Sequence, residues 1–235
     1  MKYYKINFTL NPKLRGANDY IKDYRFRKDS FEGFYWEEPK FIGNISGKKI
    51  DFIPYTVDIQ LSLKANILDL IERGGPLSSQ LLVSGKLKSI LERYRTFGIQ
   101  YFQFNVIKNK IIYDDYWILH MYEFNQMYID FKKSKIIYKR KMQDYETTHQ
   151  SEKIALNVNS LEDFNDYLKM ARENVEVITI NRLSLFNDKI KEDFFSLEFV
   201  EGGIGYFVSE KLKTEIEEAE CTGIEFQPSH LSYNE

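Results

Sequence analysis

One segment of this sequence occurs twice, and the repeat limits the folds open to the chain more than any other feature. Residues 83–101 read VSGKLKSILERYRTFGIQY, and residues 208–226 read VSEKLKTEIEEAECTGIEF. The two copies align without a gap at an offset of 125 residues, and a pair of glycines precedes each. Two copies are too few for a repeat array, which needs about three or more. We therefore expect one supersecondary unit that is used twice in one fold.

Each copy has the pattern of a strand, a helix and a second strand. A short apolar run leads to Ser84 in the first copy and to Ser209 in the second, where a serine oxygen can accept from the free N–H groups of a helix N-terminus. Apolar residues then follow at the spacing of one helix face. Gly98 and Gly223 come after the helices, where a left-handed residue commonly ends a helix. A serine could instead be a nucleophile, but nothing around either serine supports that role.

The rest of the pattern predicts an α+β protein with mixed or antiparallel sheets. Ser160 is the predicted N-cap of a helix that reaches about Ala171. We expect a short helix or turn over residues 65–72 and a short helix over residues 183–190. Alternating or aromatic-rich runs predict strands over residues 2–10, 101–107 and 110–121.

The glycines and the proline at residues 74–76 indicate a boundary within the chain. Residues 1–75 form a strand- and aromatic-rich region, and residues 76–235 form an α+β region that contains the repeat. One continuous domain is the alternative, because an independent first domain of this size would be small.

The composition indicates a globular protein with a substantial core. Hydrophobic residues make up 43% of the 235 residues, and the net charge is −2, so no general attraction to nucleic acid or to an anionic membrane is expected. The single cysteine, Cys221, excludes an internal disulfide and fits a reducing compartment. The N-terminus lacks the apolar stretch of a signal peptide, and no segment approaches the length of a membrane span. These features predict a soluble cytoplasmic protein.

Motifs that would indicate an enzyme or a metal site are missing from the sequence. The histidines His120, His149 and His230 are scattered, and none belongs to a helical zinc-binding pattern. The glycine-rich residues 202–205 precede a strand, so they predict a hairpin turn rather than a phosphate loop. Paired acids such as Glu217 and Glu218 are more typical of a solvated helix face than of acid/base chemistry. We therefore predict no catalytic residue, no cofactor and no metal ion.

Both copies of the repeat resemble signatures of a known family. Residues 206–212 (YFVSEKL) with residues 222–228 (TGIEFQP) resemble the C-terminal signature of the eleventh immunity-protein family of bacterial polymorphic-toxin systems. The first copy is similar to the N-terminal signature of that family, and residues 128–134 (YIDFKKS) look like its central Asp-x-x-Lys-Ser segment. The resemblance covers roughly residues 67–228 and leaves out the residues before about Asn66. A sister immunity family is the alternative.

The resemblance implies an antitoxin that binds a cognate toxin protein and covers its active site or substrate path. It implies no catalytic residues. Two other functions stay open. An enzyme with a site assembled only in the fold would show a deep pocket in which polar groups with perturbed pKa values converge. A generic protein-interaction module would show a broad apolar surface.

Two segments are candidates for the toxin-binding surface. Interfaces concentrate binding energy in Tyr, Trp and Arg anchors, and residues 20–36, outside the resemblance, are rich in them. A segment outside the family signatures is a sensible place for specificity, although these aromatics could simply cover one end of the core. The second candidate is the helix of the second copy, whose acids could mimic a nucleic-acid substrate. The candidate residues are Tyr24, Arg27, Tyr35 and Trp36 in the first segment and Glu217 and Glu218 in the second.

Overall fold

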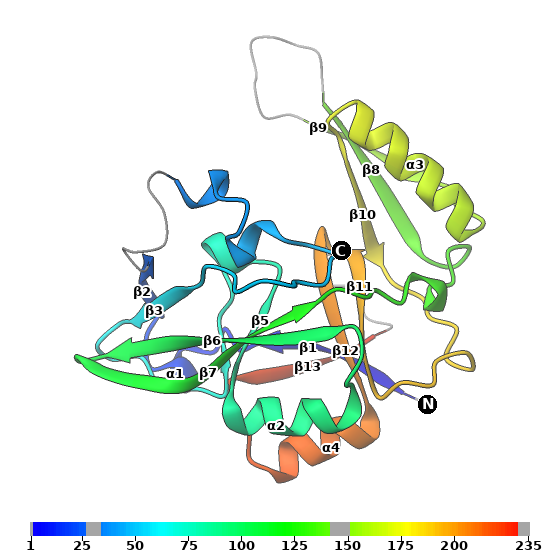
Figure 1. The fold of residues 1–235 in the computed structure, drawn as a ribbon. Helices are drawn as coiled ribbons and strands as arrows, with labels where there is room; N and C mark the ends of the chain where they lie inside the picture. Colours follow the sequence, from blue (N-terminus) through cyan, green and yellow to red (C-terminus); the bar gives the residue numbers. More distant parts are fainter. Residues whose placement is uncertain (1, 27–33, 142–150, 230–235) are drawn as a thin grey trace.

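The computed structural model describes residues 2–26, 34–141 and 151–229, and it shows an α+β fold built on two mixed sheets (Figure 1). Within these residues, the first sheet has the spatial order β13 (Ile224–Pro228), β1 (Tyr3–Phe8), β12 (Gly203–Ser209), β11 (Phe194–Val200), β10 (Val177–Arg182), β8 (Lys135–Lys141) and β9 (Ser151–Leu156). The second sheet has the order β2 (Ile21–Phe26), β3 (Val57–Leu61), β6 (Ile99–Lys108), β7 (Ile111–Met121), β5 (Leu81–Ser84) and β4 (Leu70–Ile71). The predicted fold class is confirmed.

Each of the α-helices in the described residues begins at a side chain that caps its free N–H groups. Ser160 Oγ accepts from the Asp163 N–H at 3.1 Å, as the sequence predicted, and Asn11 caps a short helix that the sequence did not reveal.

No helix in the described ranges is long and apolar enough to cross a membrane. The α-helices are α1 (Pro12–Arg15), α2 (Gly85–Tyr94), α3 (Leu161–Glu173) and α4 (Glu210–Glu218), and the 3-10 helices are η1 (Tyr35–Glu37), η2 (Ile42–Asn44), η3 (Gly75–Leu77) and η4 (Gln126–Tyr128).

Both copies of the repeat form the predicted strand–helix–strand unit. The first unit is β5–α2–β6, and the second is β12–α4–β13. Ser84 Oγ accepts from the Leu87 N–H and Ser209 Oγ from the Leu212 N–H, both at 3.2 Å. The two serines are therefore N-caps.

The glycines of the repeat have a different role from the predicted one. Gly98 and Gly223 adopt left-handed backbone angles, with φ of 74° and 83°, but they lie several residues beyond the helix ends. Their carbonyls accept from the N–H groups of Tyr122 and Thr9, at 2.9 and 2.8 Å. A Cβ on Gly223 would lie 2.5 Å from the Leu70 carbonyl oxygen, so the close approach of the chain also requires glycine there.

A third strand completes each unit and lies between its two strands. In the first unit β7 pairs antiparallel with both β5 and β6, and in the second unit β1 pairs antiparallel with both β12 and β13. Ser84 faces Tyr116 across the first pairing, and Ser209 faces Tyr3 across the second. The N-terminal strand therefore takes in the second unit the place that the hairpin strand β7 takes in the first.

The two units share one hydrophobic core. Buried residues from both, including Leu87 and Leu91 on α2 and Leu212 and Ile216 on α4, belong to a single cluster. The helices lie side by side along one edge of the molecule (Figure 1), and Glu215 on α4 pairs with Arg93 on α2.

A second cluster forms where α3 covers the far part of the first sheet. Phe164 on α3 is fully buried and contacts Phe131 and Phe199. Together with β8, β9 and β10, this helix projects from the body of the molecule (Figure 1).

Two local predictions were wrong, and tertiary hydrogen bonds explain both. Residues 65–72 contain no helix, because Leu70 and Ile71 pair with Val83 and Leu82 as strand β4. Residues 183–190 also contain no helix, since their backbone bonds to the chain around η4.

Strands on both sides of the predicted boundary share both sheets. From residues 1–75, β1 pairs with β12 and β13, β3 pairs with β6, and β4 pairs with β5. Whether residues 1–75 fold without residues 76–235 stays a prediction.

Candidate functional site

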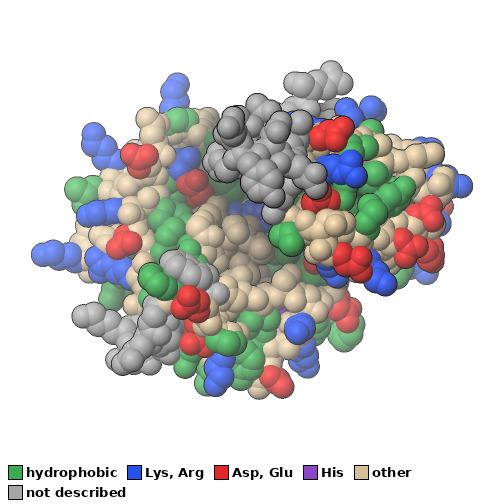
Figure 2. Space-filling view, turned by 90° about the horizontal axis from the view of Figure 1, so that it is seen from above, with side chains coloured by type: hydrophobic (Ala, Val, Ile, Leu, Met, Phe, Trp, Pro, Cys, Tyr) green, Lys and Arg blue, Asp and Glu red, His purple; other side chains and the backbone are tan. Residues whose placement is uncertain are grey.

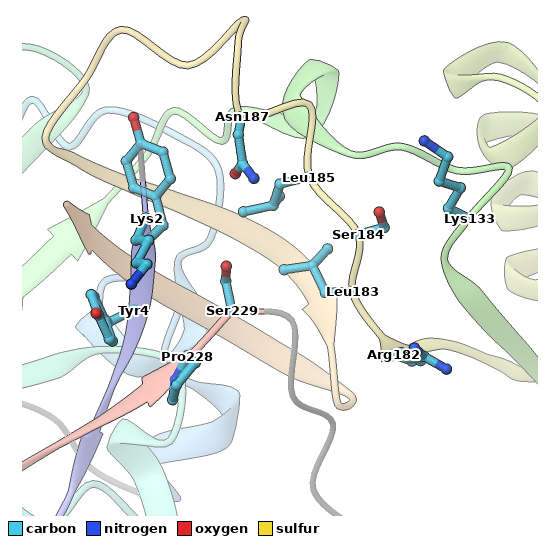
Figure 3. A pocket seen from close by; sticks show the side chains of 11 residues that line it. Lys2, Tyr4, Lys133, Arg182, Leu183, Ser184, Leu185, Asn187, Pro228 and Ser229 are labelled. Carbon is cyan, nitrogen blue, oxygen red and sulfur yellow. The ribbon is translucent and has the colours of Figure 1, made fainter. Parts of the chain in front are cut away.

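A cavity of about 510 Å³ opens where β1 begins, β13 ends and the chain leaves β10 (Figure 3). We call it the β1–β10 cavity. Its size lies within the range of about 300–1,000 Å³ that is usual for ligand pockets. Its lining residues are Lys2, Tyr3, Tyr4, Lys133, Arg182, Leu183, Ser184, Leu185, Asn187, Pro228 and Ser229.

The Asp-x-x-Lys-Ser segment forms the turn that supports one wall of this cavity. The Asp130 N–H donates to the Ser184 carbonyl at 2.9 Å, and Ser134 Oγ accepts from the Ser184 N–H at 3.0 Å. Ser134 Oγ in turn donates to the Asp130 carbonyl at 2.8 Å. Because both backbone groups of Ser184 are bonded to this turn, the wall follows an extended path and its position is fixed.

The charged side chains that line the cavity are all basic. Lys2, Lys133 and Arg182 come from three different parts of the chain, and none of the described residues that line the cavity is acidic. Lys133 Nζ lies 3.2 Å from a carboxylate oxygen of Asp130, which is buried behind it, while the Lys133 side chain itself is largely exposed. Within the described residues, neither Lys2 nor Arg182 forms an ion pair. Like charges around a concave surface raise the local concentration of anions, so the cavity favours an anionic ligand.

The predicted aromatic candidates belong largely to the core of the second sheet. The ring of Tyr35 stacks on Phe26 with 5.0 Å between centroids and also packs against Phe41. Tyr24 is half-buried on β2, beside Gly75. These contacts give Tyr24 and Tyr35 a structural role. Arg27 and the side chain of Trp36 lie outside the described residues.

Tyr24 also borders a polar hollow of about 730 Å³ together with Arg15 and Glu72. Burial, with a smaller contribution from Glu72, raises the pKa of Tyr24 to about 12. A tyrosine with a raised pKa stays protonated at neutral pH, so it is a hydrogen-bonding group there rather than a base.

The acidic candidates lie on the outer face of α4. Glu217 and Glu218 are exposed, and Glu217 pairs with Lys213 at 2.7 Å within the helix. The structure does not bring these acids together with the aromatic segment, because α4 and β2 lie at different ends of the molecule (Figure 1). On the face seen from above, acidic and basic side chains are interspersed among the described residues, around a central hollow (Figure 2).

Burial changes the pKa of His120 and of Cys221, the histidine and the cysteine that the structure describes. His120 is buried, burial lowers its pKa, and its Nε2 lies 2.8 Å from the Lys48 carbonyl oxygen. Burial raises the pKa of Cys221 to about 11, so its sulfur is a thiol at neutral pH. In the ranges that the structure covers, no three His, Cys, Asp or Glu side chains group as metal ligands. His149 and His230 lie outside those ranges.

These features define an α+β protein in which the repeated signatures form capped helices and the central signature forms the turn beside a basic cavity. A family model described as Immunity protein family (Imm11) matches residues 3–231. The chain therefore belongs to the Imm11 immunity protein family, and membership implies a toxin partner in general terms. A comparison with curated proteins found no match.

The family match corrects the extent of the resemblance. The sequence motifs suggested that the residues before about Asn66 lie outside the family, but the match begins at residue 3. It therefore includes residues 20–36, so a position outside the family gives these residues no special claim to specificity. Their candidacy rests only on residue type.

Sequence reasoning missed the basic lining of the cavity. Lys133 belongs to the central family signature, but Lys2 and Arg182 carried no signal because they are ordinary charged residues that belong to no motif. Only the pairing of β1 with β12 and β13, and the path of the chain after β10, bring them to one cavity.

Proposed function

We propose that this protein is an antitoxin of a bacterial polymorphic-toxin system, which binds one cognate toxin in the cytoplasm and blocks it by occlusion. The observation that carries the proposal is the family match over residues 3–231. The partner is a protein rather than nucleic acid or membrane, in keeping with the net charge of −2. In this mechanism the immunity protein needs no catalytic group, since covering the active site or the substrate path is sufficient.

The local chemistry supports a binding role. The sequence left open that Ser84 and Ser209 are nucleophiles. In the structure they cap α2 and α4, and their hydroxyls donate to the carboxylates of Asp69 and Asp193. Each hydroxyl therefore has a structural function in its unit.

Co-expression with the cognate toxin tests the proposal. We expect the adjacent upstream gene to encode a large secreted protein, and its C-terminal domain is the toxin to test. We expect the immunity protein to restore growth and to form a 1:1 complex by calorimetry. A toxin domain from an unrelated system is the control and should stay lethal. Protection at far below one equivalent would indicate an enzyme instead, and protection against both toxins would contradict a cognate antitoxin.

The aromatic and the acidic candidates predict different salt dependence of toxin binding. Contacts made by Glu217 and Glu218 should weaken as salt screens charges over about 10 Å at 0.1 M, whereas aromatic contacts should not. Tyr35→Ala and Trp36→Ala are therefore compared with the double change Glu217→Lys and Glu218→Lys at low and high salt. Tyr35 packs on Phe26 and Phe41. The affinity of the Tyr35→Ala variant is therefore interpreted only if its melting temperature shows that the protein is folded.

A further inference from the structure

We infer that the β1–β10 cavity is a binding site for an acidic peptide segment of the partner protein. The inference rests on the proposed function, because it takes the partner to be the toxin, and it specifies which chemistry the toxin presents. The described residues of the aromatic segment and of the acidic helix α4 are not among those that line this site.

The basic side chains around the cavity favour a ligand with negative charge. Lys2 extends from the start of β1 and Arg182 from the end of β10, so two cations stand at separate positions around one opening (Figure 3). Lys133 is the third, and the buried carboxylate of Asp130 holds it from behind at 3.2 Å. No acid is among the lining residues that the structure describes, so carboxylates are the side chains of a protein partner that match this surface.

The uncharged lining favours a peptide over a nucleic acid. Leu185 and Pro228 offer apolar contacts for aliphatic carbons, while Ser184, Asn187 and Ser229 offer hydrogen-bonding groups between them. A phosphate backbone is usually held by a long stripe of Lys and Arg, whereas here three cations surround a cavity of about 510 Å³. A segment of a few residues with an acidic side chain fits the volume and the mixed chemistry.

The cavity is also held open in the unbound protein. One wall is bonded to the Asp130–Ser134 turn through both backbone groups of Ser184, and the opposite wall is formed by paired strands β1 and β13. A preformed site loses little conformational entropy when a ligand binds, so a short acidic segment can contribute usefully to affinity.

The experiment reverses the charge of the two cations that form no ion pair with a described residue. The double variant Lys2→Glu with Arg182→Glu is compared with the control Lys49→Glu with Lys64→Glu, which makes the same charge change at exposed positions outside the cavity. We expect the cavity variant to bind the toxin domain about 10-fold more weakly or worse, with most of the difference lost at high salt. The control should bind like the wild-type protein.

A second measurement uses a defined probe. A blocked hexaglutamate peptide should bind the wild-type protein and the control variant but not the cavity variant, and a hexaglutamine peptide should bind none of them. Competition between hexaglutamate and the toxin domain would place both at one site. Equal melting temperatures of the two variants exclude misfolding as the cause.

The outcomes separate the two proposals. Toxin binding that is unchanged in the cavity variant overturns the cavity site and leaves the antitoxin function intact. If the wild-type protein neither binds nor blocks the toxin domain, the antitoxin function is wrong, and the hexaglutamate measurement alone then decides the acidic-peptide site. Equal binding of hexaglutamate to all three proteins overturns that site.

Discussion

The two strand–helix–strand units share a plan, yet they are completed from different parts of the chain. The first receives its middle strand β7 directly after β6, through a tight turn at Asn109 and Lys110. The second receives β1 from the opposite end of the chain. The first unit can therefore form its strands from nearby residues, whereas the second unit depends on a contact between the two termini, which carries a larger loop-closure entropy.

The helices of the two units also differ on their outer faces. Both helices carry the same i,i+4 ion pair, Lys88 with Glu92 on α2 and Lys213 with Glu217 on α4. Where α2 has Gly85 and Arg93, however, α4 has Glu210 and Glu218. Their buried faces are alike, and Arg93 meets Glu215 where the helices touch. The repeated pattern therefore specifies the caps, the core positions and one ion pair on each helix, while other exposed positions of the copies differ in charge.

The largest expected effect comes from separating the chain at the glycines near residue 75. Residues 1–75 contain β1, which lies between β12 and β13 of the second unit. We expect residues 76–235 alone to lose cooperative unfolding in urea, because β12 and β13 lose the strand that joins them. Hydrogen exchange should show protection retained in β5–α2–β6 and lost in β12–α4–β13.

Mixing the two fragments provides the control for that prediction. Addition of residues 1–75 should restore protection in the second unit. Two fragments that each unfold cooperatively, with unchanged protection in β12 and β13, would show instead that the predicted boundary separates independent domains.

The cap serines give a smaller effect that compares the units directly. Ser84→Ala and Ser209→Ala should each lower the free energy of unfolding by about 1 kcal/mol, measured in urea. Ser209 is fully buried and Ser84 nearly so, so we expect the larger loss at Ser209. Toxin affinity should hardly change in either variant. If a variant has an unchanged melting temperature but no longer protects cells from the toxin, the serine has a catalytic or interface role instead.

The smallest effect concerns the pH dependence contributed by Asp69. Burial alone would raise the pKa of Asp69, but hydrogen bonds from Ser84 and from Thr222 outweigh it and lower the pKa. A carboxyl whose pKa is lower in the folded state stabilises the fold above its unfolded value, about 3.9, and this stabilisation is lost as the pH falls through the folded value.

We therefore expect Asp69→Asn to reduce the loss of stability between about pH 5 and about pH 2. Thr222 belongs to the second copy, so Asp69 joins the two units. Urea midpoints over this range, with Glu218→Gln on the exposed face of α4 as the control, measure the difference. Equal slopes for Asp69→Asn and the wild-type protein would contradict the role of Asp69.

The sequence by itself determined the elements whose signals lie within a few residues. The repeat predicted both strand–helix–strand units, Ser84, Ser209 and Ser160 were identified as caps, and the family motifs pointed to an immunity protein. Capping depends on a side chain and an N–H group two or three residues away, and an apolar helix face depends on spacing along one turn. Such signals involve only residues that are close in the sequence, so they can be identified without the tertiary structure.

The tertiary structure decided which distant segments meet. The backbone groups that join two strands are the same in almost every residue. The sequence of residues 3–8 therefore does not show that they pair with β12 and β13. The same reason explains why residues 183–186 form no helix, since the backbone groups of Ser184 and Phe186 bond to the chain at Tyr128, Asp130 and Ser134. Lys2, Lys133 and Arg182 share a cavity only because those long-range bonds form.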